Sequence, residues 1–329
     1  MEALRALGAD VRLVANRDPA VGRRIAAKYA SLALSAGRAA FAARFGARHV
    51  DIVEAHIAYP TGLVARPAAA LVGAPLVLFA HGADVRDIPR RSRRHARLAR
   101  STYASAALIV ANSDFLAGEI RARFPVASGR VRVLTPGIEL DRFAHDPMAP
   151  RDGVLFVGRL IPEKGAGVLI RAMALVGGAE GPLTIIGDGP ERTRLAALAG
   201  DLDVDLDLRG ELGRADVARA MTRAAVLVVP SVYPEPLGLV ALEAMASGAI
   251  VVASATGGLV ETVLDGQTGL TVTPGDPDAL AGAIERAATL ATDPHAGASM
   301  RAAGRAMAER HDVRRAAADS LAWYGTLRR

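Results

Sequence analysis

Short apolar runs alternate with longer amphipathic stretches along the whole chain, and this alternation is what most constrains the fold. The apolar runs are rich in leucine or β-branched residues, and most of them end at Gly, Pro, Asn, His or Ser, as strands do. Strand, helix and strand in repeated succession predict parallel sheets covered by helices on both faces. The predicted strands are residues 11–15, 52–55, 75–80, 107–111, 131–134, 154–157, 183–186, 206–209, 225–229, 250–253 and 269–272. The predicted helices include residues 25–45, 62–71, 113–124, 167–175, 190–199, 214–222 and 277–290.

A chain of 329 residues is too long for one ordinary hydrophobic core and suits two domains. Residues 135–153 are rich in proline and glycine and have the composition of a linker. We therefore expect two sheets of this kind, joined near that segment.

Composition excludes several classes of protein. The chain has no cysteine, which rules out disulfides and thiolate metal sites. No apolar run reaches the roughly 18 residues of a membrane span, and the first residues lack the basic-then-apolar pattern of a secretion signal. We expect a soluble, cytoplasmic protein of a bacterium with a GC-rich genome.

Charge is unevenly distributed between the two halves. Residues 1–150 contain 22 Lys and Arg against 12 Asp and Glu, a balance of +10. Residues 151–329 contain 18 against 22, a balance of −4, and the sum is the net +6 of the chain. The first half is therefore expected to face an acidic partner or an anionic surface.

The loop after the strand at 154–157 carries two cations. It begins at Gly158 and Arg159 and ends at Lys164 and Gly165, where a helix starts. Ligands of open α/β sheets bind beyond the carboxyl ends of strands, and two cations beside a helix N-terminus suit a diphosphate. The alternative is an ordinary turn with solvated charges.

A second loop follows the strand at 225–229. Prolines flank Glu235, Gly238 allows a ligand close to the backbone, and a helix then begins. Glu243 lies in an otherwise apolar part of that helix, where a carboxylate is costly unless it is paired or reaches a ligand. The alternatives are a surface loop acid for Glu235 and an acid at the polar edge of the helix for Glu243.

These motifs resemble a known family. Glu235, seven residues and then Glu243, preceded by proline and followed by a helix, look like the signature of the family 4 retaining glycosyltransferases. The loop from Gly158 to Gly165 resembles the second signature of that family, and His81-Gly-Ala-Asp84 resembles the third. The similarity runs from about residue 4 to the C-terminus.

The resemblance implies an α/β protein of the GT-B fold, with two Rossmann-like, doubly wound parallel-sheet domains facing a cleft. Residues 1–147 would form the acceptor-side domain and residues 148–311 the nucleotide-sugar donor domain. Residues 312–329 would form a helix that crosses back to the first domain.

The resemblance also implies roles for individual residues. Arg159 and Lys164 would neutralise the departing diphosphate, and Glu235 would hold hydroxyls of the donor sugar. Glu243 would bind the ribose hydroxyls, as the acid of a dinucleotide site does. The backbone N–H groups of Leu237, Gly238 and Leu239 would cradle the phosphates, and Gly158 would also belong to the donor-binding site.

Two residues of the N-terminal half belong to the same implied donor site. His81 would reach the donor sugar, although a core histidine closing a strand is an alternative. Asp84 would contribute to donor binding or, alternatively, only cap a turn.

The family uses no metal and retains the anomeric configuration. The sequence has no Asp-x-Asp metal motif in a suitable loop, so catalysis is expected to rest on positioning and on stabilisation of the leaving group. We expect a hexosyltransferase without a cofactor. Its donor would be linked to UDP or GDP rather than ADP, and its unknown acceptor would be a lipid or a glycan.

The chain departs from the family at its start. Residues 1–11 resemble the end of the usual first helix and the start of the second strand, so we expect this chain to lack the family's first strand and its Gly-rich loop. A truncated or degraded, non-catalytic donor-binding homologue is therefore one alternative function, and a nucleotide-sugar epimerase of the same fold is another. Leu237 also replaces the more usual Phe.

Residues 86–100 contain seven arginines close to His81. They could draw the protein to anionic lipid at the inner membrane face or to a phosphorylated acceptor, or they could be a solvated helix face. Nucleic acid is not an expected partner, because aromatic residues are scarce and no known binding module is present.

Overall fold

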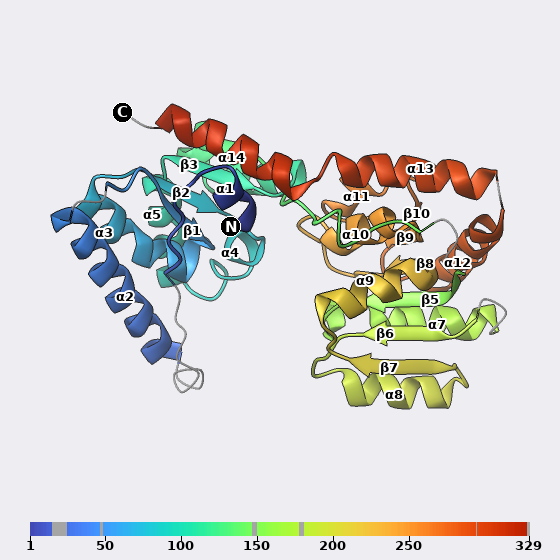
Figure 1. Cartoon of the computed structure of the whole chain (residues 1–329). Helices are drawn as coiled ribbons and strands as arrows, with labels where there is room; N and C mark the ends of the chain where they lie inside the picture. Colours follow the sequence, from blue (N-terminus) through green and yellow to red (C-terminus); the bar gives the residue numbers. More distant parts are fainter. Residues whose placement is uncertain (15–24, 47–48, 147–149, 178–180, 294, 328–329) are drawn as a thin grey trace. The chain divides into compact units, whose positions relative to one another are not determined.

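The computed structural model describes residues 1–14, 25–46, 49–146, 150–177, 181–293 and 295–327 (Figure 1). The chain forms two compact units. The first consists of Met1–Thr135 together with Ala316–Arg329, and the second is Pro136–Arg315.

The first unit is built on a four-stranded parallel sheet with the order β1-β2-β3-β4. Its strands are β1 (Val53–His56), β2 (Leu76–Phe79), β3 (Leu108–Ala111) and β4 (Val131–Val133). Its helices are α1 (Glu2–Ala6), α2 (Ile25–Phe45), α3 (Leu63–Val72), α4 (Ala83–Arg86), α5 (Arg93–Ser105), α6 (Asp114–Arg123) and α14 (Val313–Leu327), most of which falls within this unit.

Alternating side chains of this sheet enter two separate cores. Leu78 and Ile109 pack with residues of α3, α5 and α6 on one face. Val77 and Val110 point to the other face, where α14 covers them with Leu321, Trp323 and Tyr324. The last helix of the chain is thus a structural part of the first unit.

The second unit is built on a six-stranded parallel sheet with the order β10-β9-β8-β5-β6-β7. Its strands are β5 (Asp152–Val157), β6 (Leu183–Ile186), β7 (Leu206–Gly210), β8 (Ala224–Val229), β9 (Ile250–Ser254) and β10 (Leu270–Val272). Its helices are α7 (Ala166–Val176), α8 (Arg192–Asp201), α9 (Arg214–Arg223), α10 (Leu239–Ser247), α11 (Leu259–Thr262), α12 (Pro277–Thr292) and α13 (Ala296–Glu309).

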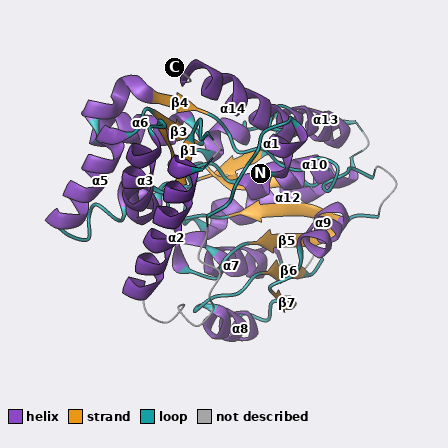
Figure 2. Ribbon diagram, turned by 60° about the vertical axis from the view of Figure 1, so that its left-hand side comes forward, coloured by secondary structure: helices purple, strands orange, loops and turns teal. Residues whose placement is uncertain are grey.

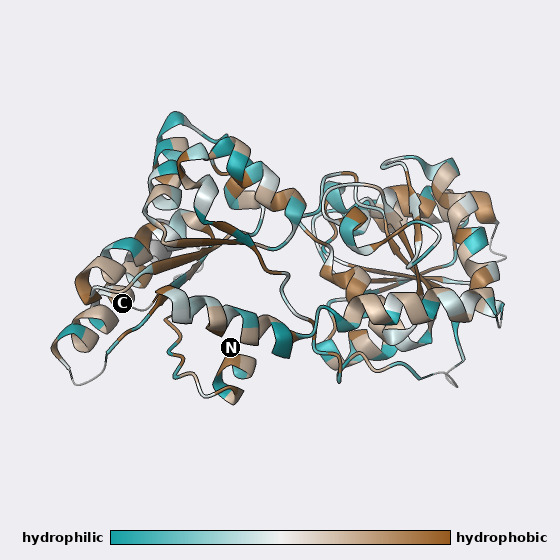
Figure 3. Ribbon diagram, turned by 90° about the horizontal axis from the view of Figure 1, so that it is seen from above, coloured by the Kyte–Doolittle hydropathy of each residue, from teal (hydrophilic) through white to brown (hydrophobic). Residues whose placement is uncertain are grey.

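Both faces of the second sheet are covered. Phe156 and Val228 pack on one face with residues of α7, α8 and α12. Leu155 and Leu227 pack on the other with residues of α9, α10 and α13. Figure 2 shows strands flanked by helices, and in Figure 3 the strands are strongly apolar whereas many helices carry both polar and apolar stretches. The predicted fold class of two helix-covered parallel sheets is confirmed.

The four and six observed strands correspond to every predicted strand except residues 11–15. That prediction is wrong for residues 11–14, which are irregular, and Ala15 lies outside the described residues. An apolar run becomes a strand only when a neighbour accepts its backbone hydrogen bonds. Among the described residues no strand pairs with this run, and Leu13 and Val14 are exposed.

The boundary between the units lies at Thr135 and Pro136, within the predicted linker but before the expected position at residue 147. Ile138 and Phe143 are buried in the core of the second unit, which draws this part of the linker into it. The expected boundary residues 147–149 lie outside the described residues.

Candidate functional site

The order of strands in the second unit reverses between β5 and β8. The chain runs from β5 outward to β6 and β7, then returns to place β8 on the other side of β5. The two strands pair in parallel, with Leu155 opposite Leu227. Their carboxyl ends are therefore neighbours, and the loops that leave them diverge, which is where open α/β sheets bind ligands.

Backbone contacts join these two loops. The N–H of Val232 donates to the carbonyl oxygen of Glu163 over 3.0 Å. Gly165 has φ +71°, and a Cβ atom at this position would lie 1.9 Å from the carbonyl oxygen of Pro230. Only glycine permits this approach, so the end of the first loop is packed directly on the start of the second.

Lys164 and Glu235 meet across the two loops. Lys164 Nζ lies 2.5 Å from Glu235 Oε1, and the hydroxyl of Ser231 donates to the same oxygen over 2.6 Å. The two side chains are 28% and 12% exposed. An ammonium group has three donors, so this contact leaves Lys164 with donors to offer an anion.

A third loop, which follows β9, supports the backbone of Glu235. The N–H of Gly258 donates to the Glu235 carbonyl over 2.7 Å. Gly257 has φ +59°, and a Cβ atom there would lie 2.2 Å from the same oxygen. At Gly258 a Cβ atom would lie 2.3 Å from the carbonyl oxygen of Pro236. Both positions therefore need glycine, since a larger residue would displace the loop that carries Glu235.

Gly158 and Arg159 begin the loop after β5. The N–H of Gly158 donates to the Ile186 carbonyl over 3.0 Å. Leu160, on the other side of Arg159, is fully buried and fixes the backbone there. Arg159 is exposed, and its side chain has no hydrogen-bond or ion-pair partner among the described residues. It is available to an anionic ligand at the carboxyl edge of the sheet.

Helix α10 begins at this edge without a side-chain cap. Gly238 is left-handed with φ +87° and Leu239 starts the helix, while Leu237 before it is buried. The first N–H groups of a helix have no partner within it and carry a partial positive charge that favours anions. The predicted phosphate-binding backbone therefore has suitable geometry.

Glu243 lies further along α10. Burial raises its pKa to about 7, with nearby Arg214 and Arg142 lowering it and Glu139 raising it. The Glu243 carboxylate has no hydrogen-bond partner among the described residues. A partly buried acid without a partner is costly, which points to a ligand that would satisfy it.

In the first unit, Asp84 is fully buried beneath the loop that carries His81. It accepts the N–H of His81 over 3.0 Å, the N–H of Ala58 over 2.9 Å and the hydroxyl of Tyr103 over 3.0 Å. Burial and the Asp84 carboxylate hold the pKa of Tyr103 well above its usual value. A carboxylate buried this completely is not accessible to a nucleotide sugar. Asp84 instead holds the loop that carries His81, in line with the predicted alternative of a residue that caps a turn.

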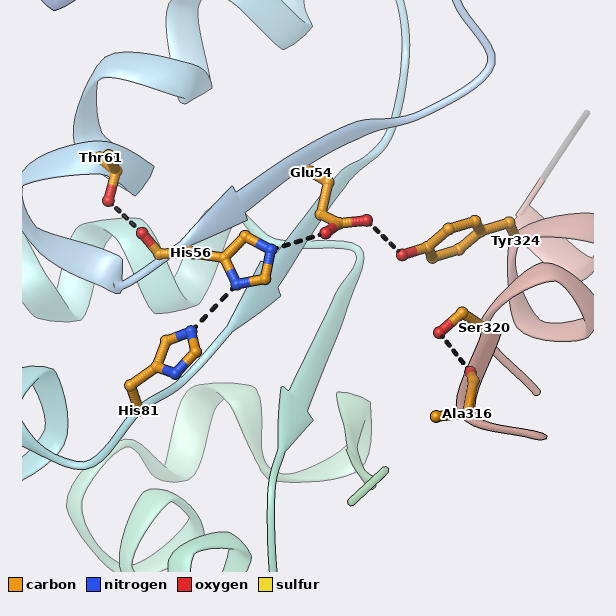
Figure 4. A network of polar contacts seen from close by, with 7 residues as sticks. All are labelled: Glu54, His56, Thr61, His81, Ala316, Ser320 and Tyr324. Atoms are coloured by element: carbon orange, nitrogen blue, oxygen red, sulfur yellow. Dashed lines mark hydrogen bonds and ion pairs between the residues drawn. The ribbon is translucent and has the colours of Figure 1, made fainter. Parts of the chain in front are cut away.

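Four polar residues that contact predicted site residues, directly or through one another, are not predicted by the sequence analysis. Ser231 contacts Glu235, and Glu54, His56 and Tyr324 are connected to His81. Figure 4 shows the last three linked to His81. Glu54 and His56 lie two residues apart on β1 and so share a face of the strand. That spacing at a strand end was an available signal, whereas nothing in the sequence pointed to Tyr324.

Arg86 does not belong to the exposed surface expected of the arginine-rich segment at residues 86–100. Arg86 is 5% exposed, and its Nε lies 3.1 Å from Glu119 Oε2 while its guanidinium lies 5.6 Å from the Phe115 ring centroid. It is a core residue, because its charge is paired inside the unit. The exposed arginines of the segment are Arg90, Arg91, Arg93, Arg94, Arg97 and Arg100.

No three His, Asp or Glu side chains of the described residues are grouped so as to hold a metal ion. In the same part of the chain, no helix has both the length and the apolar composition that crossing a bilayer requires.

Comparison with known proteins agrees with this geometry. Residues 138–306 match the model of glycosyl transferases group 1, and residues 1–142 match that of glycosyltransferase family 4. The chain belongs to glycosyltransferase family 4. In this family 4 chain the first match contains the loops of β5, β8 and β9, and the second contains His81.

Curated relatives of this family 4 chain include two glycosyltransferases with named substrates. It is 34% identical over 271 residues to the D-inositol 3-phosphate glycosyltransferase of Acidothermus cellulolyticus. The aligned region covers 72% of this chain and 59% of the relative. It is 36% identical over 220 residues to the GDP-mannose-dependent alpha-(1-6)-phosphatidylinositol monomannoside mannosyltransferase of Mycolicibacterium smegmatis, covering 58% and 56%. The chain spans from about half to two thirds of the length of the first curated relatives.

Solved structures confirm the GT-B fold of the family 4 chain. Sucrose-phosphate synthase from Thermosynechococcus elongatus superposes with a TM-score of 0.80 at 23% identity, over 99% of this chain and 91% of that one. HepE of Anabaena, solved in complex with UDP, superposes with a TM-score of 0.75 at 24% identity, over 95% and 85%.

Replacing Asp84 with alanine should destabilise the first unit by about 3–5 kcal/mol, because three buried donors lose their acceptor. Tyr103→Phe removes only one of the donors and should cost about 1 kcal/mol. Trp323, the one tryptophan of the sequence, packs on the first unit, so its fluorescence during urea unfolding reports this unit. Equal losses in the two variants would contradict the central role of Asp84.

Replacing Glu243 with glutamine should stabilise the ligand-free protein at high pH. The folded-state pKa of about 7 lies above the ordinary 4.5, so the folded state holds a proton that the unfolded state loses between these values. Stability is therefore lost as pH rises through this window, and above pH 7 the variant should recover about 1–3 kcal/mol. The measurement is urea unfolding followed by circular dichroism near pH 5 and pH 8.

The matched control is Glu285→Gln, which changes an exposed carboxylate on α12 of the same unit. It should leave the pH dependence unaltered. If Glu243→Gln were equally neutral at both pH values, the Glu243 carboxylate would not carry the inferred burial cost.

Proposed function

We propose that this chain transfers a hexosyl group from a nucleotide-diphosphate sugar to an acceptor, with retention and without a metal ion. The observation that carries the proposal is the contact between Lys164 and Glu235 at the point where the strand order reverses. The contact supports the proposal because an ammonium, a group suited to phosphate, and a carboxylate, a group suited to sugar hydroxyls, lie together where α/β sheets bind nucleotides.

The proposed role of each site residue follows from its charge and its position. Lys164 and Arg159 stabilise the diphosphate as negative charge develops on the leaving group. The first N–H groups of α10 add fixed partial charges from the other side. Glu235 accepts hydroxyls of the donor sugar, and Glu243 accepts hydroxyls of the ribose.

Relatives narrow the proposed donor and acceptor. A donor linked to UDP or GDP is proposed, since UDP is bound by HepE and GDP-mannose is the donor named for the Mycolicibacterium smegmatis relative. Starch synthase IV of Arabidopsis thaliana, another structural neighbour, was solved with ADP, so the base is a point for experiment. The same names indicate a phosphorylated polyol or a phosphoinositide-type lipid, within the proposed class of glycan or lipid acceptors. An anionic lipid acceptor would also suit the six exposed arginines of residues 90–100.

Nucleotide diphosphates should stabilise the protein against heat through the Lys164 site. With a nucleotide at a hundred times its Kd, stabilisation should reach about 2.7 kcal/mol. Lys164→Met keeps most of the apolar stem but removes the charge, and it should weaken binding roughly 10- to 100-fold, as expected for a charge-assisted bond. Thermal-shift titrations with UDP, GDP and ADP would measure both effects and identify the base.

Arg209→Ala serves as the control, because it removes an exposed cation on β7 of the same unit that pairs with Asp207. It should bind nucleotide as the wild type does. A folded protein that responds to none of the nucleotides, or a Lys164→Met variant that binds them unchanged, would refute the proposed donor site.

Chelation of divalent metals should leave sugar transfer within about twofold of its original rate, because Arg159 and Lys164 supply the charge that a metal would otherwise provide. The measurement is release of the nucleotide diphosphate with and without EDTA. Loss of activity that Mg²⁺ restores would contradict the metal-independent mechanism.

A further inference from the structure

Four polar side chains of the first unit form a continuous chain of hydrogen bonds (Figure 4). The hydroxyl of Tyr324 donates to Glu54 Oε2 over 2.6 Å. Glu54 Oε1 lies 2.8 Å from His56 Nε2, and His56 Nδ1 lies 3.0 Å from His81 Nε2. This series of hydrogen bonds links His81 to Tyr324 on α14, which lies 270 residues after Glu54 in the sequence.

The fold holds both imidazole rings in place. The ring of His56 stacks on Phe79 at the end of β2, with centroids 4.9 Å apart and an angle of 23°. Asp84 ties the loop after β1 to the loop after β2, since it accepts the N–H groups of Ala58 and His81. The two rings therefore meet through constraints on their backbones as well as through their own contact.

The direction of the hydrogen bonds follows from the first members of the chain. A carboxylate only accepts, so His56 donates to Glu54 from Nε2. At about pH 8, where an ordinary imidazole is neutral, a ring that donates from one nitrogen must accept at the other. His56 Nδ1 therefore accepts from His81 Nε2, and the unshared pair of His81 lies on its Nδ1.

His81 Nδ1 is left without a hydrogen-bond partner among the described residues. Burial, followed by the proximity of His56, lowers the pKa of His81, while Asp84 raises it. The balance favours a neutral ring, which can accept a hydrogen bond at this nitrogen.

We propose that His56 is a positioning residue that holds His81 in its Nε2–H tautomer, so that Nδ1 of His81 is kept as the acceptor for a ligand hydroxyl. Glu54 and Tyr324 fix the orientation of His56 in turn. This inference rests on the proposed function for its ligand, but the tautomer itself is a property of the ligand-free protein.

The tautomer can be measured directly by NMR of protein labelled with ¹⁵N-histidine, at about pH 8, above the ordinary pKa of histidine. Wild-type His81 should show a protonated Nε2 and an unprotonated Nδ1. A protonated Nδ1 in the wild type would overturn the proposal.

Two substitutions of His56 separate its acceptor role from its packing. His56→Phe keeps a ring against Phe79 but removes the acceptor, so His81 should lose its single tautomer. His56→Asn retains an acceptor near the position of Nδ1 and should preserve it. An unchanged His81 spectrum in His56→Phe would overturn the proposal, and thermal melting would confirm that each variant is folded.

His49 provides the control, because it is largely exposed and interacts with Asp51 rather than with His81. His49→Phe should leave the His81 signals unchanged. A similar shift in both variants would mean that the His81 spectrum does not report the contact with His56.

Activity gives an independent test. His56→Phe should lower kcat about tenfold, the effect of one misdirected hydrogen bond, while the Kd for free nucleotide diphosphate stays unchanged. Weakened nucleotide binding with an unaltered tautomer would overturn the positioning role. Failure of the proposed function would instead appear as absent nucleotide binding in the wild type, whatever the tautomer of His81.

Discussion

The parallel pairing of β5 with β8 is the interaction on which the candidate donor site depends. The strands are distant in the sequence, yet their ladder brings the ends of both to one edge of the sheet. The contacts between Lys164 and Glu235 and between Val232 and Glu163 follow from that pairing. The glycine-rich loop after β9 then adds a support that no single strand could provide.

Most of the fold could be predicted because buried parallel strands are visible in the sequence as short apolar runs bounded by turn residues. Residues 11–15 show the same apolar pattern, but a strand also needs a neighbouring strand to pair with, and composition does not reveal whether one exists. The boundary between the two compact units lies at Thr135 and Pro136 for a similar reason. Ile138 and Phe143 are single apolar residues in a proline-rich segment, and only their tertiary contacts show where they belong.

The candidate site was predictable where function coincides with position along a strand–loop–helix unit. Arg159, Lys164, Glu235 and Glu243 all follow strands whose ends meet, although their roles remain predictions. The relation between Glu54, His56 and Tyr324 was not predictable, because it joins a strand to a helix 270 residues away. Asp84 shows the converse limit: its place in a motif is evident from the sequence, whereas its complete burial and its contacts with Ala58 and Tyr103 are tertiary features.

The chain uses arginine for almost all of its positive charge, and Lys164 is one of only two lysines, the other being Lys28. Its ammonium lies part-exposed beside Glu235. Guanidinium groups are inert to most acylating reagents, whereas a primary amine is nucleophilic once it loses its proton. Coupling chemistry aimed at amines, such as dye labelling or attachment to a resin, would thus fall on very few side chains, one of them in the candidate donor site, and a bound nucleotide would shield that side chain.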